Sequence, residues 1–327
     1  MMAIKKEDIK KILIIRNDRI GDFVLTSALF RELRKNFPFA KITAVVSEKK
    51  KSMAEKNKNI DELIILGNAP RNFKEFLFYL KISNKIKKEK YDIGIDLRGS
   101  FSNAFFLLFL SRVKYKIGLF NGMFSRFLLN FSRNKKHNKH VVFYSIDLVN
   151  KALDLDIKDY WPDIEYDKDD EEYVNKFLKD KKIKKFICIV PDATHPEKQW
   201  NLENFDLLIK QINKKYPDYK ILLIGSEKNK IDFLIKRNDS CISFWNQDLR
   251  KVYILFKKSR VVLAPDGGPM HLAWAAETNL IAIFPETNPL NNYRPLGDKS
   301  VLICLNKPIE RLEIKEVMDV LQEFLNY

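Results

Sequence analysis

The sequence predicts an α/β fold made of two consecutive doubly wound domains, and three observations favour it. The chain has 327 residues, longer than one hydrophobic core usually grows, so two domains of about 150 residues each are expected. Hydrophobic residues make up 46% of the chain, which suits packed cores and excludes a disordered protein. Short apolar runs alternate with helical patterns in two successive series, as in parallel sheets covered by helices.

The first series predicts a domain at 1–165. Its apolar runs have the length and composition of buried parallel strands. The expected strands span 11–16, 41–47, 62–66 and 92–97. The expected helices span 22–36, 72–88, 101–111 and 143–153.

The second series predicts a domain at 166–327. The stretch before it, residues 154–185, changes from acidic to basic and contains Pro162, so we place the domain junction there. The expected strands span 185–191, 220–226, 241–245, 260–266, 280–285 and 300–305. The expected helices span 201–215, 227–237, 248–258, 269–277 and about 309–326.

Composition limits the partners and the compartment. The net charge of +16 favours anionic ligands or an acidic membrane surface, although a general bias toward Lys, Ile and Asn accounts for it equally well. No nucleic-acid-binding motif is found, so nucleic acid is not expected as a partner. Three widely spaced cysteines, Cys188, Cys241 and Cys304, form neither a disulfide framework nor a zinc pattern, which fits a reducing compartment.

The N-terminal residues lack a signal-peptide core, and the longest apolar run, "AFFLLFL" (104–110), is far below the roughly 20 residues needed to span a bilayer. The expected location is therefore cytoplasmic, at most peripheral on the inner face of the membrane. The segment "SNAFFLLFLSRVKYK" is either a buried helix, which is the commoner case, or a hydrophobic lip near a lipid-linked substrate.

Polar or glycine-bearing loops follow several strands directly. Ligands of doubly wound domains bind outside the carboxyl ends of the strands, so two facing domains would line a cleft with such loops. Neither the dinucleotide fingerprint G-x-G-x-x-G nor the P-loop pattern follows the first strand. Nicotinamide-dependent enzymes and P-loop NTPases are therefore disfavoured.

The segment "LAPDGGPMHLAWAAE" (263–277) predicts an anion site. A strand ends there, two glycines allow close backbone approach, and Pro269 suits the first turn of a helix. Residues expected to line a phosphate or ribose pocket are Asp266, Gly267, Gly268 and His271. An ordinary strand–turn–helix with Asp266 as a cap is the alternative.

The segment "VPDATHPEKQWNLENF" (190–205) also lies between a strand and a helix. Thr194 and Lys198 suit a diphosphate, because a hydroxyl donates a hydrogen bond and an ammonium neutralises charge. A surface loop with a solvated lysine is the alternative.

Asp22 opens the helix after the first strand. Alone, it is more often an N-cap, while its place at a strand's carboxyl end also suits a general base. Arg98 and Ser100 follow the fourth strand and are candidates for contact with an acceptor.

Five stretches together resemble glycosyltransferase family 9, the bacterial lipopolysaccharide heptosyltransferases. They are "ILIIRNDRIGDFVLTSALFRELRKNFPFAKI", "DLRGSFSN", "HPEKQWNLENFDLLI", "ILLIGSEKN" and "APDGGPMHLAWAAETNLIAIFPETNP". The most specific parts are the early Gly-Asp and the late Asp-x-Gly-x-x-His, in this order and at this separation.

The resemblance implies a GT-B fold, in which two Rossmann-like domains face a central cleft. The N-terminal domain would bind the acceptor and the C-terminal domain the nucleotide sugar, typically ADP-L-glycero-D-manno-heptose. The C-terminal helix, at about 309–326, often packs back on the N-terminal domain in this family. Its enzymes are inverting and use no metal, and no cofactor is expected.

The resemblance also implies residue roles. Asp22 falls on the catalytic base, and Thr194 and Lys198 fall on or near contacts to the donor phosphates. Asp266, Gly267, Gly268 and His271 fall on the loop that grips the donor, and Glu227 is the candidate for its ribose. Acidic sugars or lipid phosphates of the acceptor would meet basic or polar side chains, namely Arg16, Arg19, Arg98 and Ser100. Many members have Thr or Ser at the position of Gly267 and Gly at the position of Asp192. These departures concern the identity of the donor more than the fold or the type of reaction.

The predicted function is transfer of heptose from ADP-heptose to a lipopolysaccharide inner-core acceptor, a lipid-linked oligosaccharide, with peripheral contact to the anionic inner membrane. The alternatives are another nucleotide sugar used for a surface glycan, a sugar-nucleotide epimerase of the same fold, and a degenerate protein that only binds sugar nucleotides.

Overall fold

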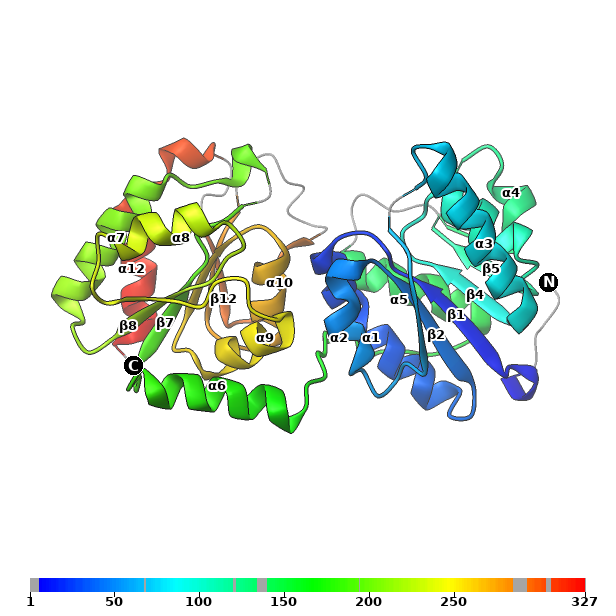
Figure 1. The fold of residues 1–327 in the computed structure, drawn as a ribbon, viewed down its shortest axis with the longest axis horizontal. Helices are drawn as coiled ribbons and strands as arrows, with labels where there is room; N and C mark the ends of the chain where they lie inside the picture. Colours follow the sequence, from blue (N-terminus) through cyan, green and yellow to red (C-terminus); the bar gives the residue numbers. More distant parts are fainter. Residues whose placement is uncertain are drawn as a thin grey trace. The chain divides into compact units, whose positions relative to one another are not determined.

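The computed structural model of the chain describes residues 6–67, 69–119, 122–133, 140–193, 195–284, 293–303 and 307–326. The chain divides into two compact units, Met1–Glu165 and Tyr166–Tyr327. Each unit has a six-stranded sheet with helices packed around it (Figure 1).

The sheet of the first unit is parallel throughout and has the strand order β3-β2-β1-β4-β5-β6. Its strands are β1 (Lys11–Ile15), β2 (Lys41–Val46), β3 (Glu62–Ile65), β4 (Ile93–Asp96), β5 (Tyr115–Gly118) and β6 (Phe131–Ser132). The α-helices are α1 (Ile20–Asn36), α2 (Lys51–Glu55), α3 (Phe73–Glu89), α4 (Ser125–Leu128) and α5 (Val141–Leu153). A π-helix, η3 (Asn103–Leu110), and two 3₁₀-helices, η1 (Lys6–Asp8) and η2 (Glu48–Lys50), complete the described elements.

The sheet of the second unit is also parallel, in the order β12-β11-β10-β7-β8-β9. Its strands are β7 (Phe186–Ile189), β8 (Lys220–Leu223), β9 (Cys241–Ser243), β10 (Val262–Pro265), β11 (Leu280–Ile283) and β12 (Ser300–Ile303). The α-helices are α6 (Lys168–Asp180), α7 (Leu202–Lys215), α8 (Lys228–Ile235), α9 (Leu249–Lys258), α10 (Gly268–Ala275) and α12 (Ile314–Leu325), with 3₁₀-helices η4 (Pro196–Lys198) and η5 (Ile309–Arg311).

The strands and helices expected from apolar periodicity are confirmed within the described residues, but the strands β5 and β6 and the α-helices α2, α4 and α6 were missed. β6 is a two-residue edge strand, and β5, between β4 and β6, is a four-residue strand of which only half is buried, so neither has a clear apolar pattern. α2 and α4 are only five and four residues long. α6 lies in the charged stretch assigned to the domain junction. Its apolar residues Tyr173, Val174 and Phe177 do have helical spacing, but they lie among many charged residues.

Both sheets have the same doubly wound order, with two strands on one side of the first strand (β1 or β7) and three strands on the other. The order reverses between β1 and β4 in the first sheet, and between β7 and β10 in the second. Ligands of such sheets bind outside the carboxyl ends of the strands at this switch point. The loops that follow β1, β4, β7 and β10 are therefore the places to look for a site in each unit.

The C-terminal helix α12 buries its apolar side in the core of the second unit. It contacts α7, β11 and β12, and its buried residues are Val317, Met318, Leu321 and Leu325. Within the described residues, the helices are all too short or too polar to cross a lipid bilayer.

Candidate functional site

A buried guanidinium, that of Arg16, organises the switch point of the first sheet. Its Nε donates to the backbone carbonyl of Asp22 at 3.0 Å, and its Nη1 donates to the carbonyl of Leu97 at 2.5 Å. Asp18 Oδ2 and Asp22 Oδ1 each lie 3.2 Å from the guanidinium. Arg16 is only 2% exposed, so it positions the loops after β1 and β4 and does not suit the acceptor contact expected for it.

Asp22 lies in the first turn of α1 but is not its cap. The N-cap residue is Arg19, and no side chain there accepts a hydrogen bond from the helix. The carboxylate of Asp22 instead pairs with Arg16 through Oδ1. The capping interpretation is therefore wrong, although an acidic group in the first turn still interacts favourably with the helix dipole.

Lys50 is a buried cation that the sequence did not single out. Its Nζ donates to the backbone carbonyl of Asp18 at 2.6 Å and to Ser47 Oγ at 2.7 Å. Burial lowers the pKa of the Lys50 ammonium to about 8, against the attraction of Asp18. Burial likewise raises the pKa of the Asp18 carboxyl, although Arg16 lowers it. Lys50 lies within three consecutive lysines, so only its place near the end of β2 could have marked it.

The loop after β4 is fixed by a second buried carboxylate, Asp96. It accepts hydrogen bonds from the backbone N–H groups of Arg98 and Ser100, at 3.1 and 3.2 Å, and from Asn103 Nδ2 at 3.1 Å. Burial raises the pKa of Asp96. Gly99 adopts φ +73°, and a Cβ there would meet the backbone of Leu119 at 2.9 Å, so this position requires glycine.

The other three residues expected to contact an acceptor lie on these loops. Arg98 Nη1 lies 3.5 Å from Asn17 Oδ1, which brings the loops after β4 and β1 together. Ser100 Oγ lies 3.3 Å from Ser102 Oγ, and Arg19 is exposed at the start of α1. The side chains of Asn17 and Asn103, which sequence reasoning missed, bridge these loops through a 3.1 Å hydrogen bond.

In the second unit, the loops after β7 and β10 are joined by an ion pair. Lys198 Nζ donates to Asp266 Oδ2 at 2.5 Å. Both side chains are largely buried, at 13% and 6% exposed. Because β7 and β10 are neighbours at the switch point, the two residues that the sequence assigned to anion binding meet there. Thr194 lies outside the described residues.

Helix α10 begins at this switch point with an open N-terminus. Gly267 is its N-cap residue and offers no side-chain acceptor, and Pro269 lies in the first turn. A Cβ on Gly267 would come no closer than 3.9 Å to another atom, so glycine is not required there. His271 is buried in the first turn, at 4% exposed. The N–H groups of this turn suit an anion.

Asp192 ties the loop after β7 to the loop after β8. Its Oδ2 accepts from the backbone N–H groups of Ser226 and Glu227, at 2.6 and 2.9 Å. A Cβ at Gly225 would lie 2.5 Å from this oxygen, so the Asp192 carboxylate would have to move if this residue carried a side chain. Glu227 is half-exposed, and its carboxylate lies 2.9 Å from Lys230 Nζ.

Lys230 and Gln199 extend this network and were also missed. Lys230 Nζ donates to Gln199 Oε1 at 2.6 Å, and that oxygen accepts from the N–H of Ala193 at 3.1 Å. The network holds the loop that precedes Lys198. Neither residue stands out in the sequence, since an amide and a lysine are ordinary on a surface.

Chemically, the second unit offers an ammonium beside a helix N-terminus, which suits a diphosphate. The first unit offers a carboxylate held by a guanidinium, which suits a proton acceptor. Within the described residues, no group of three or more His, Cys, Asp or Glu side chains gathers as metal ligands would.

Comparison with known proteins gives a family match. The model of "Glycosyltransferase family 9 (heptosyltransferase)" matches residues 79–321. Lipopolysaccharide heptosyltransferase 1 of Campylobacter coli is 26% identical over 297 residues, which cover 86% of each chain.

Two solved structures share the fold. A glycosyl transferase family 9 protein from Veillonella parvula aligns with a TM-score of 0.86 at 19% identity, covering 98% of this chain and 99% of that one. The ADP-heptose lipopolysaccharide heptosyltransferase II of E. coli aligns with a TM-score of 0.81 at 21% identity, covering 97% and 98%.

Proposed function

The chain belongs to glycosyltransferase family 9, and from this membership we propose that it transfers heptose from ADP-heptose to an inner-core sugar of lipopolysaccharide, with inversion at the anomeric carbon. Membership makes it a glycosyltransferase of the GT-B fold. The choice of donor and acceptor is supported by relatives named as lipopolysaccharide heptosyltransferases.

The observation that carries the proposal is the Lys198–Asp266 pair beside the start of α10. An ammonium has three N–H donors, and Asp266 is its hydrogen-bond partner among the described residues, so Lys198 would also donate to the diphosphate of a donor. As the glycosidic bond to the diphosphate breaks, negative charge grows on the leaving group. Lys198 and the N–H groups at Gly268 and beyond would stabilise this charge, with Thr194, His271 and Glu227 as further donor contacts.

Asp22 is the proposed base. It takes the proton of the acceptor hydroxyl as the oxygen attacks the anomeric carbon from the face opposite the leaving group, and this single displacement inverts the configuration. Arg19, Arg98 and Ser100 are the proposed acceptor contacts, because cationic and hydroxyl groups suit acidic sugars and phosphates. We place the reaction in the cytoplasm, with peripheral contact to the inner membrane.

A donor screen tests the proposal most broadly. The purified chain is titrated calorimetrically with ADP-, UDP- and GDP-sugars, and transfer to heptose-deficient lipopolysaccharide is followed by mass spectrometry. We expect ADP-heptose to bind and the acceptor to gain one heptose. Preference for another nucleotide sugar would replace the donor assignment. Conversion of a nucleotide sugar without acceptor would favour an epimerase, and binding of no sugar nucleotide would contradict the proposal.

A further inference from the structure

The first unit carries exposed apolar side chains that the transfer reaction does not use. Ten of the thirteen exposed large hydrophobic side chains among the described residues lie on or beside α3, η3 and α4. We call them the aromatic face: Phe73, Phe76, Leu77, Phe78, Phe101, Phe109, Leu110, Met123, Phe124 and Phe127. The π-helix η3 contacts both α3 and α4, so the three elements form one region.

Ring contacts hold much of this face in one arrangement. Phe73 stacks on Phe76 with the ring centroids 6.5 Å apart, and Phe76 meets the buried ring of Phe106 edge-on at 5.5 Å. Phe106 contacts Phe105 at 5.0 Å, and Phe105 stacks on Phe101 at 5.7 Å and on Phe109 at 6.2 Å. A continuous series of rings therefore runs from α3 across η3, anchored in the core.

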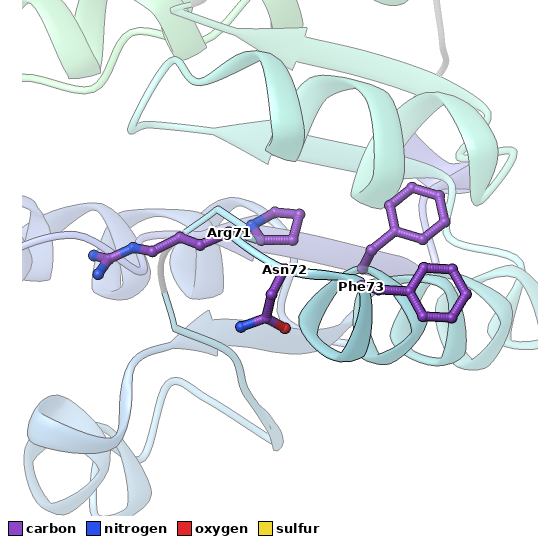
Figure 2. A pocket seen from close by; sticks show the side chains of 5 residues that line it. Arg71, Asn72 and Phe73 are labelled. Carbon is purple, nitrogen blue, oxygen red and sulfur yellow. The ribbon is translucent and has the colours of Figure 1, made fainter.

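The start of α3 is unusual because its apolar residues face solvent. Every residue from Arg71 to Phe78 is exposed, although a surface helix normally buries its apolar stripe. The surface is only shallowly depressed here, where it is lined by Pro70, Arg71, Asn72, Phe73 and Phe76. Figure 2 shows Arg71 extending away from the ring of Phe73, so a cation and an aromatic group flank the start of the helix.

The segments that bear the aromatic face are strongly basic. Residues 71–90 contain seven basic and two acidic residues, and residues 101–133 contain five basic and no acidic residue. Such a segment is attracted to an anionic surface. Two copies of the chain meeting through this face would bring like charges together, which disfavours self-association.

We propose that the aromatic face docks on the surface of an anionic lipid bilayer, with its rings at the depth of the headgroups and its basic residues on lipid phosphates. Aromatic and basic side chains are the usual pair for such interfacial contact. An exposed apolar area of this kind also marks an interaction surface. The proposal rests on the proposed function only in explaining why the enzyme needs a membrane, namely to reach a lipid-linked acceptor.

Vesicle flotation of the full chain tests the proposal. The probes are vesicles of phosphatidylcholine alone and vesicles with 30 mol% phosphatidylglycerol, about this fraction being enough to create a negative surface potential. We expect binding to the anionic vesicles that weakens in high salt and is weaker on neutral ones. The triple variant Phe73→Ser, Met123→Ser, Phe127→Ser should lose about tenfold in partition coefficient, and its side chains, 74%, 83% and 77% exposed, are not needed for folding.

A matched control is Phe39→Ser, because Phe39 is 99% exposed but precedes the amino end of β2. It should bind anionic vesicles as the unchanged protein does. Failure of the unchanged protein to bind, or equal binding by the triple variant, would overturn the proposal. The proposal would also be overturned if the unchanged protein formed a dimer in sedimentation without lipid and the triple variant did not. The aromatic face would then join two copies of the chain. Transfer to a deacylated, soluble acceptor should be unchanged in the triple variant, and failure of transfer by the unchanged protein would instead count against the proposed function.

Discussion

Arg16 holds Asp22 at two points, donating from Nε to its backbone carbonyl at 3.0 Å and from Nη2 to its carboxylate oxygen Oδ1 at 3.2 Å. The same guanidinium reaches the carbonyl of Leu97 beyond β4. The direction of the Asp22 carboxylate is therefore set by a residue at the end of β1, and not by helix capping.

Removing Arg16 should destabilise the protein. Arg16→Met leaves the carboxylates of Asp18 and Asp22 without their buried cation, so the free energy of unfolding should fall by about 3 kcal/mol. Urea denaturation measures this fall. Lys228→Met is the control, because Lys228 pairs with Asp232 on the surface and the loss there should stay below about 1 kcal/mol. Equal effects would show that the Arg16 pairs do not matter for folding.

Titration of the Lys50 ammonium should make the free energy of unfolding depend on pH. Its pKa is about 8 in the folded chain, below the ordinary value of 10.5, so between these values the unfolded chain binds the extra proton. The free energy of unfolding should therefore rise with pH across this window. We measure the free energy of unfolding of the unchanged protein and of Lys50→Met by denaturation at several pH values. From pH 7.5 to 9.5, this free energy should rise more in the unchanged protein than in the variant. Parallel pH profiles for the two proteins would contradict this.

Substitution by alanine should lower the stability of the protein at Gly225 but hardly change it at Gly267. Gly225→Ala places a Cβ 2.5 Å from Asp192 Oδ2 and disrupts the hydrogen bonds to Ser226 and Glu227, so thermal unfolding should show a loss of about 1–3 kcal/mol. Gly267→Ala has room and extended backbone, and should change stability by less than about 0.5 kcal/mol. A large loss at Gly267 would mean that its local geometry needs glycine after all.

Lys198 should matter for binding of the donor phosphates. Lys198→Gln removes a charge-assisted contact, so calorimetry should show the affinity for ADP falling about tenfold. The control is Lys210→Gln, since Lys210 pairs with Asp206 on α7, away from the switch point. ADP affinity equal to that of the control variant would assign Lys198 to holding Asp266 only.

The sequence predicted the alternation of strands and helices because buried parallel strands are short apolar runs with clear boundaries. β5, β6, α2 and α4 were missed because such short elements carry little apolar signal, and α6 was missed because its apolar residues lie among many charged ones. Strand order could not be read from the chain, since the neighbours β1 and β4 lie about 80 residues apart in sequence.

The position of loops after strands marked Asp22, Lys198 and Asp266 as candidates, but it did not show which residues pair with one another. Lys50 looks like any surface lysine, and Arg16 looks like a ligand contact rather than a buried support. Long-range packing decides which charged side chains are buried, and this packing cannot be read from a single sequence. The pairing of Lys198 with Asp266 likewise needed the adjacency of β7 and β10.

The most direct test of the account is the transfer rate of Asp22→Asn. Asparagine keeps an oxygen that can accept from Arg16, so the variant should fold and bind donor with affinity within about twofold of the unchanged protein by calorimetry. Without a carboxylate to take the acceptor proton, the rate of heptose transfer should fall about 100-fold or more. A folded variant that transfers at the unchanged rate would contradict the role of Asp22 as the base.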